Sequence, residues 1–208
     1  MTGHETTAAA REIMARCDAL AACTAEPGRI TRGYGTPALA AATGLVAGWM
    51  AAAGLAVRRD AAGNLIGRLP AADPGAPALL LGSHLDSVRD AGRYDGPLGV
   101  LLALAVAEGR AGRPLPFHLD VVAFADEEGL RFHTTYLGSR ALAGCFDPAL
   151  LDLRDADGIT LAEACHAAGG RPEALPGAGP PAALLGDRDA HSEQGPAREA
   201  LDAPLAVV

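Results

Sequence analysis

The sequence predicts an α/β protein, a three-layer αβα sandwich in which helices cover both faces of a mixed, mainly parallel sheet. Residues 79–81 and 121–125 are unbroken apolar runs, as expected for strands that are covered on both faces. Residues 97–107 between them are apolar and begin with a proline, which is typical of a helix. A strand, a helix and a second strand in this order predict a crossover between two parallel strands.

Two more helices are expected before this unit. Residues 8–20 are rich in alanine and carry apolar side chains at helical spacing. Thr36 and Pro37 precede a long apolar run that ends at Gly54. These residues indicate an N-cap, a first-turn proline and a C-terminal glycine, so a second helix should fill the run.

Shorter elements complete the prediction. Residues 56–59 and 64–69 flank a tight turn and are expected to form two short strands. Residues 161–168 favour a helix, whereas 171–186 are rich in proline and glycine and are expected to form a loop. Residues 206–208 end the sequence within a strand-like run.

Composition limits the possible functions. With 208 residues, 50% apolar and 20% charged, the chain can bury one substantial core, so one globular domain is expected. A net charge of -8 and 4% aromatic residues argue against nucleic acid as a partner. All 17 basic residues are arginine, which excludes P-loop nucleotide chemistry and Schiff-base catalysis by lysine.

The cysteines and the N-terminus indicate a cytoplasmic protein. The sequence has no C-x-x-C pair, and the first ten residues lack a basic segment followed by an apolar one. No apolar stretch reaches the roughly 18 residues that a membrane span needs, so no membrane association is expected. The four cysteines are Cys17, Cys23, Cys145 and Cys165.

Polar side chains follow the first core strand. A hydrolytic metal site needs imidazole and carboxylate ligands, an open position for water and a separate base. His84 ends the strand and is a candidate ligand, and Asp86 can hold its other ring nitrogen. Asp95, at the entrance of the next helix, has two oxygens that can bridge cations roughly 3.5 to 4 Å apart. These residues predict a metal centre at the strand end.

Two adjacent carboxylates follow the second core strand. We expect the side chains of Glu127 and Glu128 to diverge and therefore to take separate roles. One can bind metal while the other serves as general base and then general acid, a role typically worth about 100-fold to 10,000-fold in rate.

Five segments in this order identify a resemblance. The segments are G-S-H-L-D-S-V, G-R-Y-D-G-P-L-G-V, A-D-E-E-G-L-R-F, T-T-Y-L-G-S-R-A-L-A-G and H-S-E-Q-G-P. With them the chain is similar to the hydantoinase/carbamoylase family of di-metal amidohydrolases, which includes N-carbamoyl-L-amino acid hydrolases and allantoate amidohydrolases and is related to zinc aminoacylases and carboxypeptidases. The resemblance extends from about residue 11 to 208.

The resemblance implies a zinc-peptidase-like catalytic domain with two divalent metal ions. It assigns His84, Asp95 and His191 to one ion. Asp95 then bridges to a second ion, which Glu128 also binds. Glu127 becomes the general base.

The resemblance also implies the substrates and the metals. Family substrates are N-carbamoyl-L-amino acids, ureido acids or allantoate, hydrolysed at a urea-type C–N bond by metal-activated water. Zinc is favoured, and manganese, cobalt and nickel also suit a mixed nitrogen and oxygen site. Gln194 matches a position that contacts substrate.

Family members are considerably longer than this chain. Residues 1–208 are therefore expected to be the N-terminal portion of the catalytic domain, without the lid and dimerisation domain through which full-length relatives form homodimers. An alternative is an inactive fragment that folds and binds one ion without turnover. The charged residues at 187–189 also predict a weak strand before His191.

A serine hydrolase on an α/β sheet is a third hypothesis. It requires a nucleophile elbow, and Ser83, Ser139 and Ser192 all lack the G-x-S-x-G pattern. The sequence therefore favours the metal-dependent hydrolase.

Overall fold

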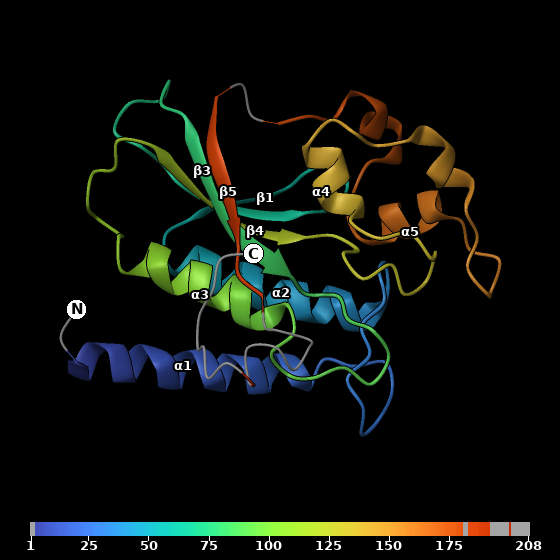
Figure 1. Cartoon of the computed structure of the whole chain (residues 1–208), viewed down its shortest axis with the longest axis horizontal. Helices are drawn as coiled ribbons and strands as arrows, with labels where there is room; N and C mark the ends of the chain where they lie inside the picture. The colour runs from blue at the N-terminus through green and yellow to red at the C-terminus, as the bar shows by residue number, and fades with distance from the viewer. Residues whose placement is uncertain (1–2, 181–182, 192–199, 201–208) are drawn as a thin grey trace.

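A five-stranded sheet in the order β1-β2-β4-β3-β5 forms the centre of this computed structural model, which describes residues 3–180, 183–191 and 200 (Figure 1). The strands are β1 (Ala56–Arg59), β2 (Leu65–Leu69), β3 (Ala78–His84), β4 (His118–Phe124) and β5 (Leu184–Asp189). The helices are α1 (Gly3–Ala21), α2 (Pro37–Ala52), α3 (Pro97–Glu108), α4 (Leu137–Leu142) and α5 (Leu161–Ala167), with 3-10 turns η1 (Pro148–Asp152) and η2 (Pro172–Gly177).

The sheet is mixed, as the sequence predicts. β1 pairs with β2 and β2 with β4 in antiparallel fashion, whereas β3 is parallel to both β4 and β5. Parallel and antiparallel pairings are therefore equally frequent among the described strands. The expected crossover is present, because α3 connects the neighbouring parallel strands β3 and β4.

Local signals in the sequence place α2 correctly. The hydroxyl of Thr36 accepts a hydrogen bond from the backbone N–H of Leu39, and Pro37 occupies the first turn of α2. Gly54, just after α2, has φ +82°, a conformation that glycine adopts without strain. The expected N-cap, proline and terminal glycine of α2 are thus confirmed.

The loop prediction over residues 171–186 is wrong in part. The structure has the short turn η2 there and then the strand β5, which lies parallel to β3. Most β5 side chains are exposed, so the charges of Asp187, Arg188 and Asp189 remain solvated. The backbone pairing with β3 therefore forms despite a composition that disfavours strands.

The two faces of the sheet are covered unequally. α2 and α3 pack on one face with α1 outside α3, as Figure 1 shows. Leu119, Val121 and Ala123 of β4 point into this large core, whereas Val122 and Phe124 point to the opposite face, where Leu142 of α4 packs. In the described part of the chain, no helix is long and apolar enough to cross a membrane.

Candidate metal centre

The candidate centre lies where two parallel strands end together. β3 and β4 are in register with His84 opposite Phe124, so the loop after β4 starts beside His84. The backbone N–H of Ala190 donates to the carbonyl of Gly82 over 3.1 Å, which brings the segment after β5 to the same end of the sheet. His191, the residue after Ala190, therefore lies at the same end of the sheet as His84.

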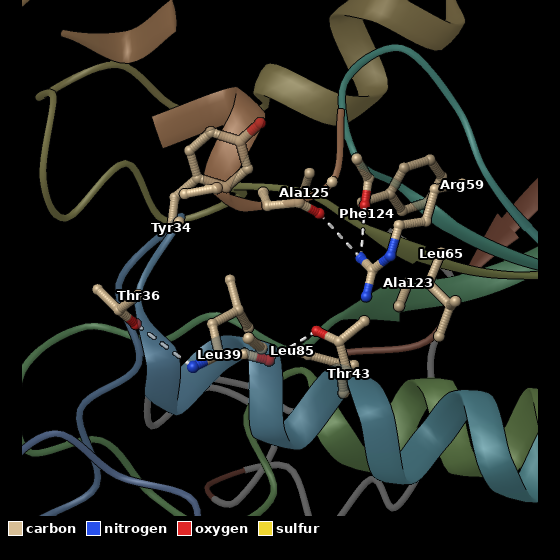
Figure 2. A pocket seen from close by; sticks show the side chains of 16 residues that line it. Tyr34, Thr36, Leu39, Thr43, Arg59, Leu65, Leu85, Ala123, Phe124 and Ala125 are labelled. Atoms are coloured by element: carbon tan, nitrogen blue, oxygen red, sulfur yellow. Dashed lines mark hydrogen bonds between the residues drawn. The ribbon is translucent and has the colours of Figure 1, made fainter. Parts of the chain in front are cut away.

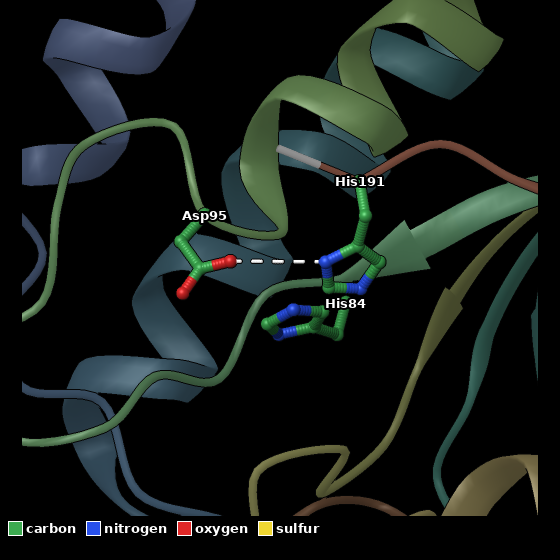
Figure 3. Close-up of side chains that lie close together, drawn as sticks. All are labelled: His84, Asp95 and His191. Atoms are coloured by element: carbon green, nitrogen blue, oxygen red, sulfur yellow. Dashed lines mark ion pairs between the residues drawn. The ribbon is translucent and has the colours of Figure 1, made fainter. Parts of the chain in front are cut away.

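His84, Asp95 and His191 form a first group of candidate ligands. One ligand atom from each lies within 4.8 Å of the others. The Nδ1 atom of His191 is 3.8 Å from Oδ1 of Asp95, and the two imidazole rings stack with centroids 5.0 Å apart (Figure 3). The structure thus brings together the three residues that the resemblance assigns to one ion.

Glu127 and Glu128 join His84 in a second group, also within 4.8 Å of one another. Oε2 of Glu127 lies 3.8 Å from Nε2 of His84. The expected divergence of the two glutamates is not observed. The reason is that β4 ends at Phe124 and Asp126 adopts φ +49°, so the alternation of a strand no longer holds at these positions.

Asp86 orients His84 through its backbone. Nδ1 of His84 lies 3.0 Å from the carbonyl oxygen of Asp86, whereas the nearest carboxylate oxygen is 3.6 Å away. The carboxylate instead accepts a hydrogen bond from the backbone N–H of Glu128 over 3.0 Å. Asp86 therefore connects the histidine to the glutamate loop.

The donor set fits a divalent metal ion. Nε2 of His84 is buried and has no hydrogen-bond partner among the described residues. Donation from Nδ1 to the Asp86 carbonyl leaves the lone pair on Nε2, the form in which imidazole binds metal. Ligands of a tetrahedral zinc ion lie about 3.4 Å from one another, given zinc bonds of about 2.0–2.2 Å. The 3.8 Å between Nδ1 of His191 and Oδ1 of Asp95 is close to this value.

Burial and the clustering of acidic side chains shift the pKa values of the residues at the centre. Burial opposes protonation of His84, but the hydrogen bond and charge of Asp86 and the charge of Glu127 outweigh it and raise its pKa to about 9. Burial also raises the pKa of Glu127 and of Glu128. A bound cation would displace the proton of His84 and stabilise both carboxylates.

Asp126 is a buried acid whose role the sequence did not indicate. Within the part of the chain that the structure describes, neither of its carboxylate oxygens has a hydrogen-bond partner, and burial with the nearby charge of Asp86 raises its pKa to about 8. The only sequence signal is its place as the first acid of A-D-E-E. The sequence also did not indicate that Asp189 lies at the centre. Its carboxylate is 3.9 Å from Nε2 of His191. Gln194, the predicted substrate contact, lies outside the described residues.

Comparison with known proteins identifies the family. Residues 64–166 match the model of peptidase family M28. The chain is 45% identical over 184 residues to an N-carbamoyl-L-amino acid amidohydrolase of Geobacillus stearothermophilus, covering 87% of this chain and 45% of that protein. An allantoate deiminase of Arabidopsis thaliana is 38% identical over 205 residues, which are 95% of this chain and 39% of that protein.

A solved structure agrees with the sequence relatives. The crystal structure of a hydantoinase/carbamoylase family amidase from Burkholderia ambifaria superposes with a TM-score of 0.82 at 36% identity, over 93% of this chain and 47% of that chain. The chain belongs to the hydantoinase/carbamoylase family within peptidase family M28. It spans less than half the length of these relatives. The described fold is accordingly part of the M28 zinc-peptidase-like catalytic domain.

Proposed function

We propose that this chain carries the metal-binding part of an amidohydrolase that cleaves a urea-type C–N bond in an N-carbamoyl-L-amino acid, a ureido acid or allantoate. The convergence of two histidines and three carboxylates on one end of the sheet supports this proposal most directly. The named relatives, an N-carbamoyl-L-amino acid amidohydrolase and an allantoate deiminase, indicate the substrate class.

In this proposal, His84, Asp95 and His191 hold one divalent ion, and Asp95 with Glu128 holds a second. Zinc is favoured, and manganese, cobalt and nickel suit the same donors. When bound, such ions polarise the substrate carbonyl and lower the pKa of a water molecule. Asp86 keeps Nε2 of His84 directed at the ion by accepting from Nδ1.

Glu127 is the proposed general base. Its carboxylate takes the proton of the attacking water and then delivers it to the departing nitrogen. Burial raises the pKa of Glu127, which makes its carboxylate a stronger base toward that water. The side chain remains partly exposed at 18%, so substrate and water can reach it.

A second candidate is a folded fragment that binds one ion without turnover. The chain spans less than half of its relatives, and the second ion has only Asp95 and Glu128 as proposed protein ligands. Substrate contact through Gln194 and homodimer formation, as inferred for full-length relatives, also remain proposals for this chain.

Metal content and ammonia release distinguish the two candidates. We would load the chain with zinc or manganese, measure metal per chain by mass spectrometry, and assay ammonia from N-carbamoyl-L-amino acids and allantoate. His84→Ala should lose metal and activity, Glu127→Gln should keep metal and lose activity, and the exposed His166→Ala should change neither. Metal retention without ammonia release would favour the fragment, and no metal binding in the unsubstituted chain would refute both candidates.

A further inference from the structure

A cavity of about 150 Å³ lies between α2, the strands β1, β2 and β4, and the end of α5, outside the candidate metal centre (Figure 2). Its walls are mostly apolar. Leu39 of α2 and Leu65 and Ala123 of the sheet line it, together with Leu85 just after β3 and Ala168 just after α5. An engineered apolar cavity of this volume holds benzene, a ligand of about six non-hydrogen atoms.

One charged side chain enters this cavity. The guanidinium of Arg59 projects from the end of β1 toward α2, with Thr43 facing it, as Figure 2 shows. Nη1 of Arg59 donates to the carbonyls of Ala168 over 3.1 Å and Gly63 over 3.4 Å. These bonds fix the guanidinium, and they leave the N–H groups of Nε and Nη2 without a partner among the described residues.

The charge of Arg59 also lacks a counterion among the residues that the structure describes. Arg68 pairs with Asp120 and Arg131 pairs with Asp155, but no carboxylate of the described part of the chain forms an ion pair with Arg59. Burial lowers the pKa of Arg59, and the guanidinium remains charged at neutral pH. A planar cation with free parallel donors matches a carboxylate in a bidentate geometry.

We propose that this cavity binds a small aliphatic monocarboxylate of about six non-hydrogen atoms, such as butyrate. The carboxylate accepts hydrogen bonds from Nε and Nη2 of Arg59. The aliphatic chain occupies the space lined by Leu39, Leu65 and Ala123. The site is separate from the metal centre, so it does not depend on the proposed hydrolase function.

Ligand-detected saturation-transfer NMR on the metal-free chain tests this site. Butyrate should bind saturably, whereas the uncharged 1-butanol and the larger benzoate should each bind about 10-fold or more weakly. Removing metal excludes carboxylate binding at a metal ion. An absence of saturable butyrate binding, or equal binding of butyrate and 1-butanol, would overturn the proposal.

Three variants locate the binding. Arg59→Met removes the guanidinium at similar length and should weaken butyrate binding about 10-fold or more. Thr43→Phe fills the cavity and should abolish binding, whereas its matched control Thr43→Val keeps the volume and should bind normally. Circular dichroism shows whether each variant is folded. If Thr43→Phe is unfolded, the butyrate binding of Arg59→Met alone tests whether the ligand binds in this cavity. Unchanged binding in Arg59→Met, or in a folded Thr43→Phe, would show that the ligand binds elsewhere.

Discussion

The ring of His84 is oriented by the backbone of Asp86, whose carbonyl oxygen lies 3.0 Å from Nδ1. The end of β3 and the loop that follows it thereby fix which ring nitrogen is available to a metal ion. The Asp86 carboxylate is then free to accept from the N–H of Glu128, so a single residue holds both sides of the candidate centre.

Asp86→Ala should lower metal affinity by about 10-fold to 100-fold, the usual effect of losing a partner that orients a ligand. The reason is that the Glu128 loop loses its anchor while the carbonyl contact to His84 remains. Asp86→Asn is the matched control and should lower metal affinity less, because its amide oxygen can still accept the hydrogen bond from the N–H of Glu128. Competition with a chelator measures both, and equal affinity in Asp86→Ala and the unsubstituted chain would contradict this role.

Metal affinity should rise with pH up to about pH 9. The raised pKa of His84, about 9 against an ordinary 6.5, means that the protonated ring stabilises the metal-free fold fully below pH 6.5. This stabilisation is lost as the pH rises through 9. Metal binding needs the neutral ring, so apparent affinity should increase by about tenfold per pH unit below that value. Calorimetry in buffers of different ionisation enthalpy should detect proton release near pH 7, and binding without it would be inconsistent with this pKa.

Gly99→Ala should disturb the His191 side of the centre. A Cβ at Gly99 of α3 would overlap the carbonyl oxygen of Ala190 and lie 2.6 Å from Cβ of Ser83. We expect a loss of about 1–3 kcal/mol in stability from overpacking, together with weaker metal binding. Gly44→Ala on α2 is the control, because nothing lies within 4 Å and alanine favours a helix by about 1 kcal/mol. Equal thermal unfolding midpoints for Gly99→Ala and Gly44→Ala would contradict this close packing.

Asn64→Ala should destabilise the fold by about 2–4 kcal/mol, because it leaves buried backbone groups unpaired. The fully buried amide of Asn64 accepts from the N–H of Ala125 over 2.8 Å and donates to the carbonyl of Gly138 over 3.0 Å. Asp73→Ala, in an exposed turn, should change stability by less than about 0.5 kcal/mol. Urea unfolding compares the two, and similar midpoints would refute the structural role of Asn64.

Local patterns were sufficient to predict most of the fold. Periodicity and capping residues predicted α2 and α3, and the unbroken apolar runs predicted β3 and β4, because each signal lies within the element itself. For β5 the sequence predicted only a weak strand before His191, after a loop up to residue 186, because the pairing of β5 with β3 depends on residues about a hundred positions away. Its exposed charges carry no strand pattern of their own.

The candidate site was predicted in composition but not in detail. Motifs identified His84, Asp95 and His191, which the structure brings together. The carbonyl contact of Asp86 and the left-handed conformation of Asp126 are backbone features that side-chain motifs do not encode. The approach of Glu127 and Glu128 depends on that conformation.

Anomalous diffraction at the zinc edge, from crystals of the zinc-loaded chain, tests the central claim most directly. We expect a peak about 2.0–2.2 Å from a ring nitrogen of His84, with an oxygen of Asp95 and a nitrogen of His191 at similar distances. A second peak should lie between Asp95 and Glu128 if both ions bind. A zinc peak remote from His84, or none at the end of β3, would contradict the metal centre proposed for this protein.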